Sequence, residues 1–337
     1  MSDQFYRAFE DKYRGTRGLI KSRLQVYLPF VKPLKLKNPQ EQIKAIDLGC
    51  GRGEWLELLT EEGGFLVHGV DLDQEMLKVA KLFKLQVTQQ DAVQFLKSLP
   101  DESQAIVSGF HLAEHISFTE LQELIKQALR VLQPAGLLIL ETPNAENLAV
   151  GTVNFYLDPT HNRPIPAQLM TFIPSFYGFK RTKIIRLQET LDLVNRPNEV
   201  GLIDIINGVS PDYAVIAQKA AEAKQMCKFD AAFNKQYGIT VEQVAKCYED
   251  NIESKIEAIL VRAQAAEAKT QAAEAKTQAA EAKTQAAEAK TQAAEAKTQA
   301  AEAKTQAAEA KVYSMLNSKS WRITLPLRGF MSLFKKS

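Results

Sequence analysis

The chain has 337 residues, of which 45% are hydrophobic and 24% charged, with a formal net charge of +2. This length allows one ordinary globular domain with extensions. Beyond Val312 there are five basic residues and no acidic one, so +2 overall leaves −3 for the rest, which is no surface for a nucleic acid. The three cysteines lack metal-like spacing and favour a reducing compartment. The polar N-terminus argues against a signal peptide, and no apolar run is long enough to cross a bilayer.

Residues 1–40 are predicted to form a helical lead-in, with a helix over about Gln4–Tyr27. Its candidate core contacts are Phe5, Phe9, Ile20 and Leu24. Prolines at positions 29, 33 and 39 are expected to break the chain before the first strand.

Residues 41–219 are predicted to form a doubly wound α/β domain, because short β-branched runs alternate with amphipathic helices. Ligands of such domains bind at the carboxyl ends of the strands. The first five strands are expected near Ile43–Asp47, Leu66–Val70, Gln86–Thr88, Ala105–Ser108 and Leu137–Glu141.

The first predicted strand runs into Asp47-Leu-Gly49-Cys-Gly51-Arg-Gly53. Glycines let the backbone turn tightly and approach a ligand, and the following helix N-terminus offers free N–H groups. A dinucleotide fingerprint needs its third glycine at position 54, where this chain has glutamate. The pattern instead resembles the first motif of class I S-adenosylmethionine-dependent methyltransferases, with a Rossmann-like fold.

Further residues carry this resemblance. Asp71 ends the second strand, where a carboxylate can accept hydrogen bonds from both ribose hydroxyls of S-adenosylmethionine. By resemblance, Asp91 lies beside the adenine amino group, and the segment 108–115 lines the sulfonium and methyl. The alternative interpretation is that Asp47, Asp71 and Asp91 are surface carboxylates in turns at the strand ends. The candidate cofactor-binding residues are Asp47, Gly49, Gly51, Asp71, Leu72, Asp91, Ala92, Phe110, Arg14 and Arg23; the two arginines either hold the cofactor's carboxylate or are solvated helix charges.

The segment His111-x-x-Glu114-His115 also has the letters of an inverted zinc-protease motif. A zinc site of that kind needs these residues on a helix face with a third ligand, and here they follow a buried strand. No metal site is therefore predicted. The segment is interpreted as a loop near the methyl group or as a structural histidine.

After the fifth strand, the segment 154–164 is stiffened by prolines and presents Asp158, His161 and Arg163. It is either an acceptor site or a turn stabilised by its aspartate. A helix near Ala167–Phe176 and strands near Lys183–Gln188 and Tyr213–Gln218 would close the sheet as in the family.

Residues 220–251 are predicted to form a helical neck, and residues 252–316 a heptad-repeat coiled coil. One register puts Ala265 and Ala268 in the core and meets Ser254 and Ser314 at its ends. The other has alanine at d and threonine at a, at positions 270, 277, 284, 291, 298 and 305. Only the second places Ile252, Ile256, Ile259, Val312 and Met315 on the seam.

The second register puts Glu at every e and Lys at every g, so that Lys269 faces Glu274 of a parallel partner. Within one helix these charges are not neighbours. A parallel homo-oligomer, dimer or trimer, is therefore expected; a single spacer helix or a disordered tract are the alternatives. An unbroken helix from Ile252 to Met315 would be about 95 Å long.

Residues 317–337 form a basic amphipathic tail. It is expected to bind the cytoplasmic face of the inner membrane or a polysaccharide polymerase there, unless it is a disordered end. Its apolar residues are Trp321, Leu325, Leu327, Phe330, Leu333 and Phe334.

The order of domains, with the Asp158-Pro-Thr-His161-x-Arg163-Pro and 320–328 segments, resembles bacterial terminators of lipopolysaccharide O-antigen chains. The resemblance implies methylation of the non-reducing terminal sugar of a glycan on a lipid carrier, with the coiled coil setting chain length. A direct sugar hydroxyl acceptor is favoured, because no kinase pattern is present. Alternatives are a small-molecule, quinone or other polysaccharide methyltransferase, or a membrane-tethered scaffold without catalysis.

A sugar hydroxyl needs a general base to remove its proton. His161 is the first candidate for that base and His111 the second, with Asp158 orienting the imidazole.

Overall fold

The structure is a computed structural model that describes Tyr13 and residues 15–35, 43–190, 193, 195–324, 326 and 328. The predicted cofactor residue Arg14 and the candidate core residues Phe5 and Phe9 lie outside the described residues. The chain divides into two compact units, Met1–Ser254 and Lys255–Ser337.

The first unit is built around a seven-stranded sheet with the order β3-β2-β1-β4-β5-β7-β6. Strands β1 to β5 pair in parallel, and β7 runs antiparallel between β5 and β6. All the predicted strands are confirmed, as is the doubly wound α/β fold. The strands are β1 (Ile43–Leu48), β2 (Phe65–Asp71), β3 (Val87–Gln89), β4 (Gln104–Phe110), β5 (Leu132–Pro143), β6 (Arg181–Leu187) and β7 (Asp212–Gln218).

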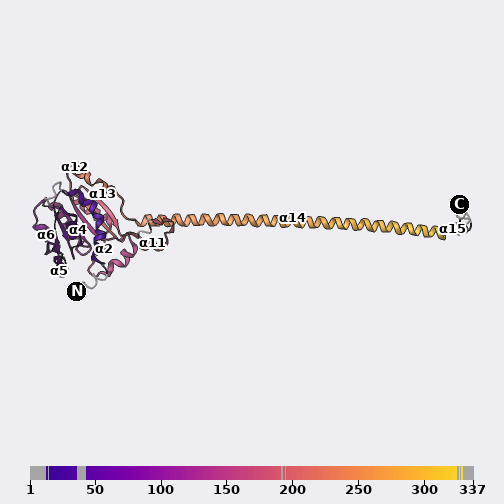
Figure 1. Ribbon diagram of the computed structural model, residues 1–337, viewed down its shortest axis with the longest axis horizontal. Helices are drawn as coiled ribbons and strands as arrows, with labels where there is room; N and C mark the ends of the chain where they lie inside the picture. Colours follow the sequence, from indigo (N-terminus) through magenta and orange to yellow (C-terminus); the bar gives the residue numbers. More distant parts are fainter. Residues whose placement is uncertain are drawn as a thin grey trace. The chain divides into compact units, whose positions relative to one another are not determined.

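Helices cover both faces of the sheet (Figure 1). Each face has its own hydrophobic core between the strands and the helices that cover it. One face is covered by α2 (Arg17–Leu24), η1 (Gln25–Tyr27), α3 (Leu28–Val31), η2 (Lys32–Leu34), α4 (Glu54–Glu62), α5 (Gln74–Leu82), α12 (Ala223–Met226), η5 (Cys227–Phe229) and α13 (Asp230–Asn234). The other is covered by α6 (Ala92–Ser98), α7 (Phe118–Val131) and α9 (Ala167–Tyr177). The predicted helix 167–176 is thus confirmed.

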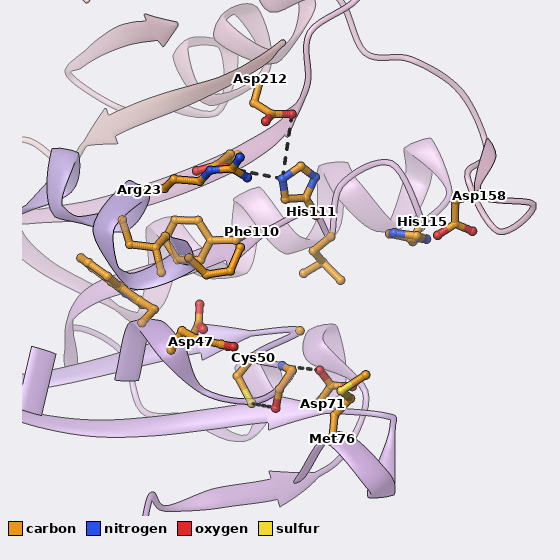
Figure 2. Close-up of a pocket in the computed structure, with 18 of the residues that line it drawn as sticks. Arg23, Asp47, Cys50, Asp71, Met76, Phe110, His111, His115, Asp158 and Asp212 are labelled. Carbon is orange, nitrogen blue, oxygen red and sulfur yellow. Dashed lines mark hydrogen bonds and ion pairs between the residues drawn. The ribbon is translucent and has the colours of Figure 1, made fainter. Parts of the chain in front are cut away.

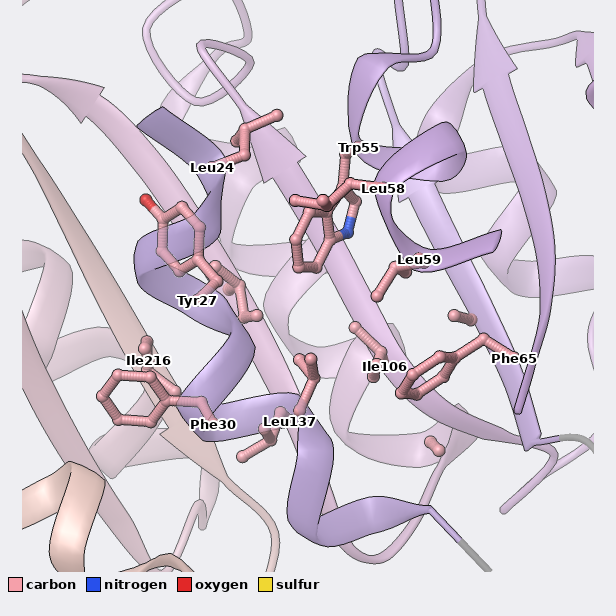
Figure 3. Close-up of a cluster of buried hydrophobic side chains, with 14 of the residues drawn as sticks. Leu24, Tyr27, Phe30, Trp55, Leu58, Leu59, Phe65, Ile106, Leu137 and Ile216 are labelled. Carbon is pink, nitrogen blue, oxygen red and sulfur yellow. The ribbon is translucent and has the colours of Figure 1, made fainter. Parts of the chain in front are cut away.

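The described part of the lead-in packs into the first core. Thr16 caps α2 by accepting a hydrogen bond from the Leu19 amide. Tyr27 and Phe30 are fully buried among side chains from β4, β5 and α4 (Figure 3). As expected, the prolines at positions 29 and 33 interrupt the helical run, since each lies at the start of a new short helix. Both stand in the first turns of α3 and η2, where the missing N–H would have no helical partner.

Shorter elements complete the first unit: α8 (Leu148–Thr152), η3 (Asn154–Leu157), η4 (Pro197–Glu199) and α11 (Leu202–Asn207). Residues 220–251, expected as a helical neck, hold α12, η5, α13 and the first turns of α14. Phe229 and Phe233 in this stretch are buried in the first core, and Val244 is buried with Val209 in a third, smaller cluster. This stretch therefore contributes to the packing of the first unit.

The repeat forms one continuous helix, α14 (Val241–Asn317), followed by α15 (Lys319–Ile323). From Ile252 to Leu316 every residue of α14 is exposed, including the apolar residues at both ends of the repeat. Each repeat threonine donates its hydroxyl to the carbonyl four residues earlier, as Thr270 does to Ala266 at 3.1 Å. Among the described helices, none is long and apolar enough to span a membrane.

Candidate cofactor and acceptor site

A cavity of about 440 Å³ opens at the carboxyl ends of β1, β2, β4 and β5 (Figure 2). The predicted site residues that line this cavity come from the ends of β1, β2 and β4, from α2 and from the loop between η3 and α9. They are Arg23, Asp47, Gly49, Gly51, Asp71, Phe110, His111, Asp158 and His161. We call the part formed by Asp47, Gly49, Gly51 and Asp71 the glycine end. The part formed by His115, Asp158 and His161 is called the histidine end. The wall is completed by residues of α2 and by Phe110, His111, Leu112, Glu141 and Asp212.

At the glycine end, the backbone takes conformations that side chains rarely adopt. Gly49 has φ +64°, and a Cβ there would lie 3.3 Å from Leu112; Gly53 has φ +80°, and a Cβ there would lie 2.6 Å from Leu85. The turn therefore requires glycine and leaves backbone facing the cavity.

The carboxylate of Asp71 holds this turn in place. One oxygen accepts the Gly51 amide at 2.7 Å, and the other accepts the Asp73 amide at 2.8 Å. Asp47 is almost fully buried and accepts a hydrogen bond from the Ser108 hydroxyl at 2.8 Å, which joins β1 to β4. Both carboxylates thus fix the strand ends from which the glycine end is built.

Three of the predicted cofactor residues do not line the cavity. Leu72 is 67% exposed, and Ala92 is the first residue of α6. Asp91 caps α6, accepting the Gln94 amide through its Oδ1 at 2.9 Å. Phe110 and Arg23 do line it; Phe110 packs edge-on against Trp55 with ring centroids 5.5 Å apart.

His111 lies in the cavity wall among three carboxylates. It has φ +54°, its Nδ1 is 3.0 Å from Glu114, and its Nε2 is 3.4 Å from Glu141 and 4.0 Å from Asp212. Tyr27 donates its hydroxyl to the other oxygen of Glu141. Figure 2 shows His111 facing Asp212.

This environment charges the imidazole. Burial alone would lower the pKa of His111, but hydrogen bonds to Glu114 and Glu141 and the charge of Asp212 raise it well above its ordinary value. Burial raises the pKa of Asp212 to about 6, although His111 and Arg23 oppose the rise. The raised pKa favours the imidazolium form, which has no free lone pair, so this environment argues against His111 as a general base.

The histidine end is held by a chain of hydrogen bonds. Thr160 donates its hydroxyl proton to Asp158 at 2.6 Å. Because this proton is used, the Thr160 oxygen accepts a hydrogen bond from Nδ1–H of His115 at 2.9 Å. His161 donates from Nδ1 to the Phe155 carbonyl at 2.6 Å. The two imidazoles meet edge to face, with centroids 4.7 Å apart.

These contacts change two expectations. Asp158 does not orient His161, whose Nε2 is 3.9 Å from it; the Phe155 carbonyl does. Instead, Asp158 acts through Thr160 on His115, which sequence reasoning left without a catalytic role. Burial lowers the pKa of His115 despite the nearby Glu114 carboxylate, which favours the neutral ring. The signal for His115 was its place beside Glu114 in the segment after β4.

Backbone contacts tie the loop to that segment. Asn162 donates its amide to the Glu114 carbonyl at 2.8 Å and its side-chain amide to the His115 carbonyl at 2.9 Å. Arg163, expected beside the cofactor, does not line the cavity and stacks on the Phe118 ring at 4.5 Å. The histidine end is thus assembled from residues about 45 positions apart in the chain.

A family model described as a methyltransferase domain matches residues 45–136, which include the whole glycine end. A solved S-adenosylmethionine-dependent methyltransferase from Archaeoglobus fulgidus is similar to this chain at 32% sequence identity and a TM-score of 0.55. The likeness covers 64% of this chain and 100% of that one. The chain belongs to the class I S-adenosylmethionine-dependent methyltransferases. The predicted cofactor is thereby confirmed.

Curated relatives match over shorter stretches. This methyltransferase is 32% identical over 106 residues to a ubiquinone biosynthesis O-methyltransferase from Idiomarina loihiensis, covering 30% of this chain and 42% of that protein. It is 25% identical over 135 residues to a probable S-adenosylmethionine-dependent methyltransferase from Mycolicibacterium smegmatis, covering 40% and 51%. The chain spans about half the length of the curated relatives it matches.

The glycine end fits S-adenosylmethionine. Its backbone approaches the cavity where a Cβ at Gly49 would crowd Leu112, and the cavity volume is in the range of small-molecule sites. Asp71 and Arg23 both lie on the cavity wall, where the carboxylate would accept hydrogen bonds from ribose hydroxyls and the guanidinium would pair with the cofactor's carboxylate.

Proposed function

We propose that this methyltransferase methylates a hydroxyl of the non-reducing terminal sugar of a lipid-carried glycan, such as a lipopolysaccharide O-antigen, and so ends chain growth. The observation that carries the proposal is α14, a 77-residue unbroken helix on the same chain as the methyltransferase domain. Methyl transfer to a small diffusible acceptor needs no such helix. An enzyme that controls the length of a polymer needs an element of defined length, and α14 can supply it.

The chemistry divides between the two ends of the cavity. When bound, S-adenosylmethionine would supply a methyl group on a sulfonium. Its transfer to the acceptor oxygen would break the carbon–sulfur bond, with the electron pair staying on sulfur, and the hydroxyl's proton would pass to Nε2 of His161. The glycine end and Arg23 hold the donor. The acceptor hydroxyl binds at the histidine end, where the Nε2 atoms of His115 and His161 lie opposite the Nδ1 donors and can accept a hydrogen bond. Positioning donor and acceptor contributes most of the rate.

The repeat is proposed to form a parallel homo-oligomeric coiled coil. The threonine hydroxyls are satisfied within their own helix, so the a positions present methyl groups to a partner. Ile256 is 51% exposed and Met315 57% exposed, and both fall on the same seam. Such a seam is narrow and straight, which suits an element of set length.

The C-terminal tail is proposed to bind the cytoplasmic face of the inner membrane or a polymerase there. The described part holds Trp321, over whose ring the guanidinium of Arg328 lies at 3.3 Å. The predicted apolar contacts 325, 327, 330, 333 and 334 lie outside the described residues. An oligomer would multiply weakly binding tails and so raise the avidity. A chain ending at Lys311 should then be lost from the membrane fraction.

The test is an in-register series in the repeat. Removing Thr270–Lys283 deletes two heptads, keeps every a/d and e/g position and shortens the helix by about 21 Å. We expect the glycan ladder in cells to shift to shorter chains, and a two-heptad insertion to shift it to longer ones. Methylation of a short soluble acceptor should not change. A ladder that stays fixed across the series would reduce the repeat to an oligomerisation device.

A second candidate is methylation of a small molecule, since several curated relatives are named ubiquinone biosynthesis O-methyltransferases. Mass spectrometry separates the two. Cells without the gene should lose the methyl group from the terminal sugar and keep their quinone pool, whereas the opposite result supports the quinone reading. If neither changes while purified protein still binds S-adenosylmethionine by calorimetry, the chain is a non-catalytic scaffold.

A further inference from the structure

Three side chains converge at the histidine end. Glu114, His115 and His161 each bring one potential ligand atom to a point where all three atoms lie within 4.8 Å of one another. Glu114 follows β4 and is almost fully buried, while the other two line the cavity. The carboxylate is held from behind by His111 at 3.0 Å and by the Thr142 hydroxyl at 2.9 Å. Each of its oxygens keeps a lone pair beyond these bonds.

The hydrogen bonds of the two histidines decide their tautomers. Nδ1–H of His115 donates to Thr160, whose own proton goes to Asp158. Nδ1–H of His161 donates to the Phe155 carbonyl. In a neutral ring the other nitrogen, Nε2, then carries a lone pair. Ligating histidines are commonly fixed in this way by a carboxylate or a backbone carbonyl on the far nitrogen.

A neighbouring cluster shows the difference. His111, Glu141 and Asp212 also lie within ligand distance of one another. There, however, both nitrogens of His111 already lie beside carboxylates, Nδ1 3.0 Å from Glu114 and Nε2 3.4 Å from Glu141, so neither is left to bind an ion. In the first cluster, by contrast, each histidine uses only its Nδ1 in a hydrogen bond, and Nε2 of His161 lies 3.9 Å from Asp158, beyond hydrogen-bond distance.

We propose that Glu114, His115 and His161 bind a divalent transition-metal ion such as Zn²⁺ or Mn²⁺, and that the acceptor's hydroxyl oxygen takes one of its open positions. Two imidazoles and one carboxylate with a vacant position are the donor set of many catalytic zinc sites. The role as hydroxyl site rests on the proposed function; the metal site itself does not. A coordinated hydroxyl loses its proton to water more readily, and the ion fixes the oxygen at the histidine end.

The test uses the full-length protein, stripped with a chelator and titrated with Zn²⁺ and Mn²⁺. Binding is followed by metal analysis after equilibrium dialysis and by the Mn²⁺ electron paramagnetic resonance signal. All proteins carry Cys227→Ser, because this exposed thiol can hold zinc. We expect about one ion per chain. His115→Ala, His161→Ala and Glu114→Gln should each weaken binding by at least about tenfold.

His68→Ala is the matched control. This histidine lies on β2, bonds to Thr88 and is not part of the cavity wall, so metal affinity should be unchanged. Calorimetry with S-adenosylmethionine on every variant shows whether the fold and the glycine end survive. Binding that is equal in wild type and the three ligand variants overturns the proposal, as does the absence of binding of both metals to wild type. The metal-binding measurements need no glycan acceptor. A negative result in the glycan assay would therefore count against the proposed function and not against the metal site.

Discussion

The glycine end of the cavity is shaped by backbone, and the histidine end by side chains carried on a loop. At the first, Gly49 and Gly53 take positive φ angles. The Asp71 carboxylate accepts one backbone amide from the segment after β1 and one from the segment after β2. At the second, His115 and His161 are brought together across about 45 residues by Thr160 and Asn162. A donor shared by a whole family suits a fixed backbone, whereas an acceptor particular to one enzyme suits exchangeable side chains.

The largest expected effect comes from emptying the histidine end. His161→Ala removes the Nε2 atom that we propose faces the acceptor, whether this atom takes a proton or binds an ion. We expect kcat to fall by about 10²–10⁴ while the Kd for S-adenosylmethionine changes little. Turnover of a glycan acceptor and calorimetry measure the two quantities, with His68→Ala as the control. Equal losses in both would mean that the two ends do not act separately.

The glycine end is tested at Asp71. Asp71→Ala removes the acceptor for the Gly51 and Asp73 amides as well as the proposed ribose contact. Charge-assisted hydrogen bonds are worth about 1.5–3 kcal/mol, so the Kd for S-adenosylmethionine should rise tenfold or more. Asp101→Ala, which removes an exposed carboxylate, is the control. An unchanged Kd would remove Asp71 from the cofactor site.

The same contrast explains what sequence alone could reach. The seven strands and the glycine turn follow from local patterns, because burial and positive φ angles are written in residue type and spacing. The roles at the histidine end depend on which carbonyl or hydroxyl meets each imidazole. Asp158 bonds to Thr160 two residues later, which matches the alternative of a turn stabilised by its aspartate. The role of His115 could not be predicted, since its contact with Thr160 joins residues 45 positions apart. Pro29 and Pro33 could be read as breaks because a proline is tolerated only in the first turn of a helix, and there each begins a new short helix.

Between the two ends lies a charged cluster whose stability depends on pH. Burial raises the pKa of Asp212 to about 6 from 3.8, with Glu141 and Glu114 adding to the rise and His111 and Arg23 opposing it. A raised carboxyl pKa means that the folded state binds the proton more tightly. The protonated Asp212 carboxyl therefore contributes to the stability of the folded state at low pH, and this contribution is lost as pH rises from about 4 through 6.

Asp212→Asn cannot ionise, so it should unfold at a higher temperature than wild type at pH 8. A shift of one pKa unit corresponds to about 1.4 kcal/mol, and we expect a gain of roughly 1–3 kcal/mol. Thermal melts across the pH range should show the gain shrinking below pH 6 and vanishing near pH 4. Asp101→Asn, on an exposed residue, should show no such trend. If the stability gain of Asp212→Asn is the same at every pH, it does not come from the titration of Asp212.

The smallest effect concerns Asp91, which caps α6 and does not line the cavity. Its Oδ1 caps α6 by accepting the Gln94 amide, while the family resemblance gives it a hydrogen bond from the adenine amino group. Asp91→Asn separates the two roles, because asparagine caps a helix about as well but presents an amide donor in place of the second oxygen. We expect an unchanged melting temperature and a Kd for S-adenosylmethionine raised about threefold to tenfold, the worth of one hydrogen bond. Asp91→Ala should add a loss of about 1 kcal/mol in stability from the missing cap. If both variants bind S-adenosylmethionine as wild type does, Asp91 serves the helix alone, and the cofactor is held without it.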